Sequence, residues 1–387
     1  MPVPFGDPRK PYHRKQAFDV GDVGLGVTCN QLALGCDCLG HIKYFDGFRV
    51  DSKGNPVHLK NVICLHEKDP GILHKHTNYR NGEVTVVRNL QLAVQMICTL
   101  SNYEYIFAWI LDLAGGIEFE TRATGIVSTI PIDNENGLTV PWSTNVGPNI
   151  SAPNHQHIFS LRIDPAIDGF KNTVVYEINV PLSTSVHRNK VSDSFGVGYV
   201  AETTVLEKSC FAENDAEKGR VFKIRKDNVI NSISCAPVAY KIQTVSSPKM
   251  LMSPTSYNRR RAQYSQHPVW VTRYQDGELY AAGEYTNQSK SSDGVEKWAA
   301  RGDNVRNEDV VFWHTFNLTH NPRTEDFPVM PVERVSVQLK PAGFFEKNPA
   351  IDVPASSQAS NQSDLHENAS GSGQKGTGSC CSKRSLL

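Results

Sequence analysis

The sequence predicts a mainly β protein in which residues 1–353 form one large antiparallel β-sandwich. Short runs of β-branched and aromatic residues recur along the chain, separated by Gly, Pro, Asn and Asp, which is the pattern of strands joined by turns. No long segment combines a period of 3.6 residues with helix caps. A chain of 387 residues, 39% of them hydrophobic, is also long enough to bury an ample core.

The predicted strands follow one another in chain order. They cover residues 83–100, 105–111, 157–164, 173–180, 268–274 and 334–340. Residues 203–228 are rich in Lys, Glu and Asp, and we expect a turn or two of helix or an exposed hairpin there. From Pro354 onward the chain is mostly Ser, Gly, Gln and Asn, which cannot bury enough apolar surface to offset the entropy of ordering. Residues 354–387 are therefore predicted to be a disordered tail.

The overall composition excludes several classes of function. Lys plus Arg and Asp plus Glu both number 40, so no net charge points to a nucleic-acid partner or an acidic membrane surface. The sequence has no run of about 18 apolar residues that would span a membrane, and its N-terminus lacks the apolar segment of a signal peptide. The nine cysteines include no C-x-x-C pair, which removes support for zinc-ribbon and thioredoxin-like folds.

Two histidines open the predicted strand at residues 157–164. His155 and His157 are two residues apart, so in a strand they share one face with the apolar Phe159. A third histidine, His320, ends another strand-like run just before a turn that contains Pro322. Three neutral imidazoles with open positions suit Zn²⁺ or Cu²⁺, and the order of affinities favours Cu²⁺.

A His-x-His pair is weak evidence of a metal site when it stands alone. A second pair, His74 and His76, lies among polar residues and is read as part of a solvated loop. The alternative interpretation of His155 and His157 is that they are ordinary core or surface histidines with no metal. The choice depends on chemistry elsewhere in the chain.

That chemistry comes from the segment TLSNYEY at residues 99–105. It matches the motif T-x-x-N-Y-(D/E), and two further matches are THNPRTEDFPVMP at residues 319–331 and FDVGDVGLG at residues 18–26. With NHQH at residues 154–157, these motifs occur in the order found in the copper-containing quinoprotein amine oxidases. Over roughly residues 2–353 the chain resembles the catalytic domain of that family, and most closely its fungal peroxisomal-type members. On its own, Tyr103 would be an ordinary strand tyrosine and Asp19 an ordinary turn residue.

The resemblance implies a specific set of site residues. Tyr103 corresponds to the tyrosine that copper and O₂ convert to topaquinone, the carbonyl compound that forms a Schiff base with the amine. The ligands of Cu²⁺ would be His155, His157 and His320. Asp19 would accept the α-proton of the amine, and Asn102, Glu104 and Phe5 would support the cofactor. The implied reaction converts a primary amine and O₂ to an aldehyde, ammonia and hydrogen peroxide.

Two departures from the family pattern leave other functions open. Phe5 stands where the family usually has a Tyr whose hydroxyl bonds the quinone, and family members carry two small N-terminal domains ahead of this segment. The chain is thus expected to be either a piece of a longer polypeptide or a truncated product. A catalytically silent β-sandwich that serves as a binding or scaffold subunit is the alternative function, and a zinc hydrolase built on the three histidines is a third.

The resemblance also implies some secondary features. Cys38 and Cys64 correspond to a disulfide, with two buried thiols as the alternative. Asp164 and Asp309 match a peripheral calcium-type site, with ordinary surface acids as the alternative. The family forms homodimers. The resemblance favours a peroxisome, whereas the C-terminal Ser-Leu-Leu lacks the basic residue of a peroxisomal signal, so the expected location is the peroxisome or the cytoplasm.

Overall fold

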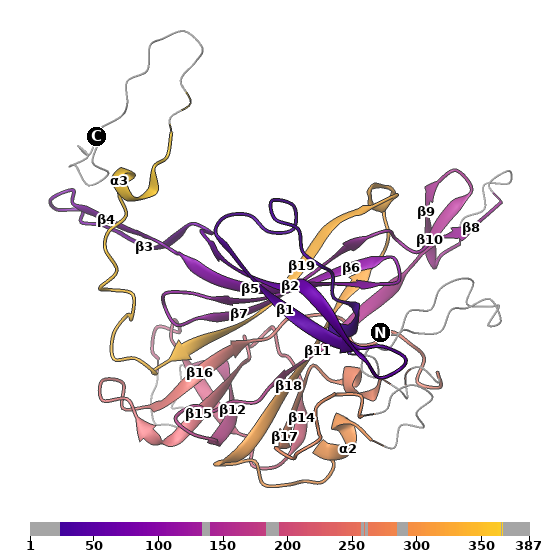
Figure 1. The fold of residues 1–387 in the computed structure, drawn as a ribbon. Helices are drawn as coiled ribbons and strands as arrows, with labels where there is room; N and C mark the ends of the chain where they lie inside the picture. The colour runs from indigo at the N-terminus through magenta and orange to yellow at the C-terminus, as the bar shows by residue number, and fades with distance from the viewer. Residues whose placement is uncertain are drawn as a thin grey trace.

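Antiparallel strands make up most of the chain (Figure 1). The computed structural model describes residues 24–133, 140–182, 193–256, 259, 262–284, 293–364 and 366. Its strands are β1 (Ile42–Val50), β2 (Pro56–Lys68), β3 (Ile72–Thr77), β4 (Val84–Arg88), β5 (Gln91–Leu100), β6 (Tyr103–Leu111), β7 (Ile117–Gly125), β8 (Ile130–Pro131), β9 (Ser143–Gly147), β10 (Ile150–Pro153), β11 (His155–Ile163), β12 (Lys171–Pro181), β13 (Tyr199–Val205), β14 (Cys210–Ala212), β15 (Val221–Ile230), β16 (Pro237–Gln243), β17 (Val269–Arg273), β18 (Glu308–His320) and β19 (Met330–Ala342). The helices are short: η2 (Leu25–Thr28), η3 (Gln263–Gln266), α2 (Val295–Ala299), η4 (Thr324–Asp326) and α3 (Gln358–Asn361).

One continuous sheet supplies both layers of the fold. Its strands are ordered β1-β2-β5-β6-β7-β19-β16-β15-β12-β18-β17-β14, with β11 added beside β18 and β13 beside β12. Figure 1 shows the first half of this order lying above the second half, with β19 and β16 at the fold between them. The predicted mainly β, antiparallel sandwich is confirmed.

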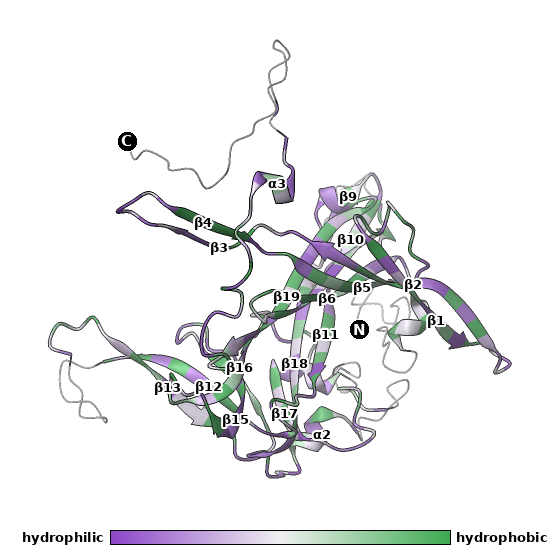
Figure 2. Ribbon diagram, turned by 60° about the vertical axis from the view of Figure 1, so that its left-hand side comes forward, coloured by the Kyte–Doolittle hydropathy of each residue, from purple (hydrophilic) through white to green (hydrophobic). Residues whose placement is uncertain are grey.

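The core fills the space between the two halves. Buried Phe312 and Phe316 on β18 pack in one cluster with Val337 and Leu339 on β19. Figure 2 shows hydrophobic residues alternating with polar ones along the strands, as expected where one face of each strand is buried. Another cluster combines Tyr103 and Tyr105 on β6 with Ala123 on β7 and Met330 on β19, and it supplies the two tyrosines of the site described below.

A hairpin and a small three-stranded sheet extend from this body. β3 pairs with β4, and β9, β10 and β8 form a separate small sheet. The hairpin and the three-stranded sheet project from opposite sides in Figure 1. Exposed side chains of Ile72 and Tyr79 belong to the β3–β4 hairpin. Within the described ranges, no helix has the length and apolar character needed to cross a membrane.

Three sequence expectations need correction. Residues 203–228 hold no helix and no hairpin, because β13 and β15 both pair with β12 and lie on either side of it. His74 and His76 lie on strand β3 and not in a loop, although His76 is exposed as expected. The ordered chain also continues past the predicted boundary at residue 353, because the backbone N–H of Ser356 donates to the carbonyl of Val86 on β4 at 2.8 Å and α3 follows.

Candidate metal centre

Strand pairing brings the three predicted histidines together. β11 runs antiparallel to β18, and His155 lies directly opposite His320 in the register. His157 is two residues further along β11, so its side chain leaves the same face as that of His155. Histidines more than 150 positions apart in the sequence thereby lie side by side.

The cluster has the composition and spacing of a metal site. Within the described residues, these three form the one group of His, Cys, Asp and Glu side chains whose ligand atoms all lie close together, within 4.8 Å of one another. His155, His157 and His320 are buried, with exposed fractions of 4%, 1% and 2%. A metal–nitrogen bond is about 2.0–2.1 Å long, so two nitrogens on one ion lie at most about 4.2 Å apart. Side-chain shifts of about half an ångström would bring the set onto one ion.

His155 and His320 each use one ring nitrogen for a bond to the protein. Nδ1 of His155 donates to the carbonyl oxygen of Pro153 at 2.8 Å, which leaves Nε2 as the acceptor and potential ligand. Nε2 of His320 bonds Oδ2 of Asp326 at 3.0 Å. Nδ1 of His320 is buried and has no hydrogen-bond partner among the described residues. A buried polar nitrogen without a partner is costly, and a bound ion would satisfy it.

His157 is held in the same way by a tyrosine. The hydroxyl of Tyr105 lies 2.6 Å from Nδ1 of His157, so the ring presents Nε2 to its neighbouring histidines. The three outer contacts, from Pro153, Tyr105 and Asp326, fix the orientation of each imidazole before any ion binds. Such outer partners are a regular feature of histidine metal sites.

Burial keeps the histidines neutral. Burial lowers the pKa of His155 to about 4, with a smaller contribution from nearby His320. The pKa of His157 lies well below its ordinary value, again because of burial and then of its histidine neighbours. Neutral imidazoles have the free lone pair that a metal needs. The donor set therefore fits a copper ion, for which imidazole nitrogen is a suitable ligand.

Tyr103 lies directly against this cluster. Its hydroxyl is 2.8 Å from Nε2 of His155, the nitrogen that a metal would take. The ring centroid lies 4.8 Å from that of His157, and the backbone N–H of Ser128 donates to the hydroxyl at 3.3 Å. Burial raises the pKa of Tyr103 to about 12, so the phenol stays protonated and its O–H donates a hydrogen bond to Nε2 of His155. The phenol oxygen thus lies beside the lone pair that would hold an ion.

The remaining polar residues of the segment 99–105 face away from the histidines. Thr99 and Glu104 are opposite each other on β5 and β6, and Oγ1 of Thr99 donates to the Glu104 carboxylate at 2.8 Å. Nδ2 of Asn30 donates to the same carboxylate at 3.2 Å. These bonds tie β6 to its neighbours on the side opposite Tyr103. The side chain of Asn102 is exposed, and its role in restraining the cofactor ring stays a prediction.

A glycine permits the backbone packing around Tyr103. Gly125 on β7 pairs with Tyr103 and has φ +108°, a region that favours glycine. A Cβ at this position would lie 2.5 Å from the carbonyl oxygen of Asn102 and 3.0 Å from Cα of Tyr103. We did not anticipate Gly125, Tyr105, Asp326 or Pro153 as site residues from the sequence.

Four other predicted site residues do not belong to the histidine cluster of the described structure. Asp19 and Phe5 lie outside the described residues. The predicted disulfide is not formed, because Cys38 and Cys64 are both free, buried thiols. The two are nevertheless neighbours: burial, and next a hydrogen bond to the Cys38 thiol, raise the pKa of Cys64 to about 12.

The two acids of the predicted peripheral site influence each other. Burial, and then the charge of Asp164, raise the pKa of Asp309. Nη1 of Arg162 lies 3.2 Å from Oδ2 of Asp164 and supplies one positive charge there. A peripheral cation at this place stays a prediction.

Not every buried histidine belongs to the site. His314 is fully buried on β18, but the carbonyl of Pro268 and the backbone N–H of Val245 bond its two ring nitrogens, each at 2.8 Å. Both polar atoms are satisfied within the protein, so His314 is a structural residue. His314 is thus an ordinary core histidine, which was the alternative interpretation of His155 and His157.

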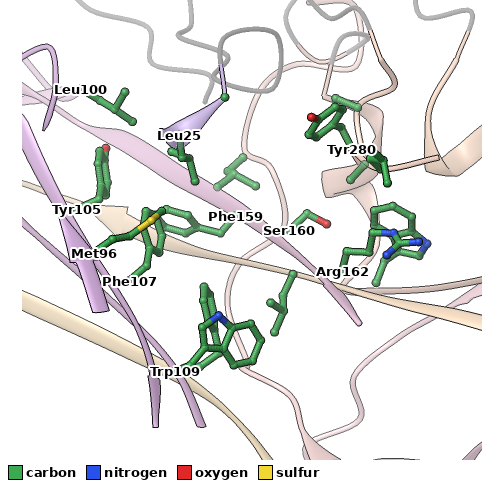
Figure 3. Close-up of a pocket in the computed structure, with 18 of the residues that line it drawn as sticks. Leu25, Met96, Leu100, Tyr105, Phe107, Trp109, Phe159, Ser160, Arg162 and Tyr280 are labelled. Atoms are coloured by element: carbon green, nitrogen blue, oxygen red, sulfur yellow. The ribbon is translucent and has the colours of Figure 1, made fainter. Parts of the chain in front are cut away.

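An apolar cavity of about 460 Å³ borders the site (Figure 3). Tyr105 lies in its wall, so a single tyrosine side chain contacts both the cavity and His157. The labelled lining residues in Figure 3 are Leu25, Met96, Leu100, Tyr105, Phe107, Trp109, Phe159, Ser160, Arg162 and Tyr280. The wall is mainly aromatic and aliphatic, which suits small or apolar molecules.

Comparisons with known proteins agree with this geometry. A family model described as the enzyme domain of copper amine oxidase matches residues 1–360. Copper amine oxidase 1 of Aspergillus niger is 47% identical over 94% of this chain and 53% of its own length, and the peroxisomal primary amine oxidase of Pichia angusta is 38% identical over 92% and 52%. The crystal structure of a copper-containing benzylamine oxidase from Hansenula polymorpha superposes with a TM-score of 0.86 at 51% identity, covering 92% of this chain and 55% of that one. The chain spans about half the length of these relatives.

Proposed function

The chain belongs to the copper amine oxidase family, and from this premise we propose that it carries the catalytic centre of a primary-amine oxidase. The proposed reaction is RCH₂NH₂ + O₂ + H₂O → RCHO + NH₃ + H₂O₂. One observation carries the proposal: the Tyr103 hydroxyl lies 2.8 Å from Nε2 of His155, a member of the three-histidine cluster. A catalytically silent sandwich would have no need for this contact.

The ligands of the copper ion would be Nε2 of His155, Nε2 of His157 and Nδ1 of His320. In each imidazole the other ring nitrogen bonds an oxygen of the protein, which orients the ligand nitrogen toward the cluster. When bound, copper with O₂ would supply the oxidation of the Tyr103 ring to topaquinone, and the quinone carbonyl would be the electron sink for amine oxidation. The protein prepares for this chemistry by keeping the imidazoles neutral and by excluding water around Tyr103.

The other roles belong to residues that orient groups or move protons. Asp326 orients His320, and its own carboxylate is fixed by the backbone N–H of Arg323 at 2.8 Å. Tyr105 orients His157. Asp19 is proposed as the base that accepts the α-proton of the amine, and Asn102, Glu104 and Phe5 as residues that support the cofactor.

The substrates are proposed to be a primary amine and O₂, and the assembly a homodimer. The projecting β3–β4 hairpin, with exposed Ile72 and Tyr79, offers apolar surface for a second copy. A peroxisomal location is proposed because one relative is a peroxisomal primary amine oxidase. A calcium-type ion between Asp164 and Asp309 is the proposed peripheral cation.

The test uses the full chain loaded with Cu²⁺ in air. A redox-cycling quinone stain with nitroblue tetrazolium at alkaline pH and a peroxide assay with a primary amine measure the cofactor and turnover. We expect both signals for the unaltered chain and for the matched control Tyr240→Phe, whose hydroxyl bonds Gly115 away from the site. Tyr103→Phe should give neither signal. Stain from Tyr103→Phe, or a copper-loaded parent chain without stain or peroxide, would refute the proposal.

A further inference from the structure

Three sulfur atoms lie together between the segment after η2 and strand β5, apart from the histidine cluster. Sγ of Cys29 is 3.7 Å from Sγ of Cys98 and 3.9 Å from Sδ of Met96. Met96 and Cys98 are two residues apart on β5, so their side chains leave the same face of the strand. Sγ of Cys29 therefore lies within 4 Å of both sulfur atoms on β5.

Backbone pairing holds this arrangement in place. Cys29 and Cys98 form an antiparallel bridge, and the N–H of Asn30 donates to the carbonyl of Ile97 at 2.9 Å. That bond identifies Cys29 and Cys98 as a non-hydrogen-bonded pair, the kind whose Cα atoms lie only about 4.5 Å apart. Cys98 is fully buried, whereas Cys29 and Met96 are half-buried and connect the cluster to the outside.

The two sulfur–sulfur distances measured from Cys29 match the spacing of ligands around one ion. A metal–sulfur bond is about 2.3 Å long, so three sulfurs around an ion in one plane lie about 4.0 Å apart. The observed separations are 3.7 and 3.9 Å. A disulfide would need a sulfur–sulfur distance of about 2.05 Å, and Cys29 and Cys98 are free thiols.

We propose that Cys29, Met96 and Cys98 form a binding site for Cu(I). Thiolate and thioether sulfurs select this soft monovalent ion, whereas structural zinc takes four ligands drawn from Cys, His, Asp and Glu. Binding replaces the two thiol protons by the ion: two protons leave to solvent, and two thiolates, one thioether and one Cu(I) form a complex with a net charge of −1. Copper keeps its oxidation state throughout.

The Cys98 thiol is otherwise unreactive. Burial, and then the neighbouring Cys29 thiol, raise the pKa of Cys98 to about 12. Cys98 therefore stays protonated near neutral pH until a cation displaces its proton, and it is a poor nucleophile in the meantime. Both thiols lie close to the carbonyl oxygen of Leu25, at 3.4 Å for Cys98 and 3.8 Å for Cys29.

The sulfur site adjoins the histidine cluster through one tyrosine. Cys98 is directly opposite Tyr105 in the β5–β6 register, and the Tyr105 hydroxyl contacts Nδ1 of His157 at 2.6 Å. Figure 3 shows Met96 and Tyr105 in the wall of the same cavity. A transfer of copper from the sulfurs to the histidines would depend on the proposed function. The binding of Cu(I) by the sulfurs does not depend on it.

The test measures Cu(I) binding by the full, metal-free, reduced chain without air, in competition with bicinchoninate as the coloured chelator. All variants carry Cys380→Ser and Cys381→Ser, because adjacent thiols there would also take Cu(I). We expect Cys29→Ser/Cys98→Ser to remove one tightly bound Cu(I) per chain. The matched control Cys36→Ser/Cys235→Ser removes two exposed thiols and should keep it.

Two further measurements make the result decisive. His155→Ala/His157→Ala should keep the tight Cu(I), which separates this site from the proposed oxidase centre. Met96→Leu conserves volume and should weaken binding about tenfold or more, even if the serine variants unfold. Equal Cu(I) binding by the Cys29→Ser/Cys98→Ser variant and its control, or loss of the tight ion only in the histidine variant, would overturn the proposal.

Discussion

The Tyr105 hydroxyl lies 2.6 Å from Nδ1 of His157, two residues along β6 from the tyrosine that faces His155. Two tyrosines on one face of a strand thus contact two histidines on one face of the opposing strand. The first contact orients a ligand, and the second places a ring beside the ion. This division of roles leads to the first prediction.

Tyr105→Phe should lower copper affinity by about 10- to 100-fold, because it removes the partner that orients His157. Tyr103→Phe should bind copper like the parent chain, because its hydroxyl contacts the ligand nitrogen and not the outer one. Competition with a Cu²⁺ chelator measures both affinities. Equal affinities for the two variants would show that Tyr105 does not act through His157.

Asp326→Asn should destabilise the metal-free chain near neutral pH by about 2 kcal/mol. Burial alone would raise the pKa of Asp326, but hydrogen bonds from Arg323 and His320 outweigh it and lower the pKa to about 2. The contribution of the Asp326 carboxylate to the free energy of unfolding is therefore complete above about pH 4, and it is lost as the pH falls through about 2.

Urea unfolding of Asp326→Asn and the parent chain at pH 7 and at lower pH measures this difference. The difference in unfolding free energy between Asp326→Asn and the parent chain should shrink below about pH 4. The neighbouring exposed residue supplies the control, since Glu325→Gln should leave the unfolding free energy almost unchanged at each pH. A gap that is absent at pH 7 would contradict the role of Asp326.

The metal-free chain should lose stability as the pH falls from about 6.5 toward 4. Burial lowers the pKa of both His155 and His314 to about 4, so the unfolded chain takes up protons in this window and the folded chain does not. His314→Gln removes one such group without touching the metal ligands, and its urea midpoint should depend less on pH between 7 and 5. An unchanged pH dependence would count against a buried neutral His314.

Gly125→Ala should destabilise the chain by about 1–3 kcal/mol and slow formation of the quinone. The added Cβ would lie 2.5 Å from the carbonyl oxygen of Asn102, at φ +108°. Gly26→Ala is the matched control, because nothing lies within 4 Å of the Cβ it adds. Thermal unfolding and the quinone stain report the two effects. Equal melting temperatures for the two variants would mean that the backbone near Tyr103 tolerates a side chain.

Short sequence motifs and the alternation of side chains along a strand were enough to predict much of the site. Alternation along a strand put His155 and His157 on one face, and the motif ending in Pro331 marked His320. The structure adds the register, with His155 opposite His320, which no local pattern contains. The oxygen partners Pro153 and Asp326 were likewise out of reach, because their roles depend on how the imidazoles are oriented in space.

The predictions from the sequence that were wrong have a common physical origin. Within residues 203–228, the charged residues Lys223 and Arg225 hid a strand, because in β15 they alternate with the buried residues Phe222 and Ile224. Neighbouring strands on both sides stabilise β15 in a way that composition does not reveal. The ordered chain passes the predicted tail boundary because Ser356 is tied to β4: its backbone N–H donates to the carbonyl of Val86, and its hydroxyl accepts from the backbone N–H of Arg88.

The most direct test of the account is the mass of the peptide that contains Tyr103, measured after the metal-free chain has been loaded with Cu²⁺ in air. Conversion to the quinone adds two oxygen atoms and removes two hydrogen atoms at Tyr103, and we expect this change in the parent chain but not in His320→Ala. An unmodified Tyr103 in a chain that holds one copper ion on its histidines would contradict the account.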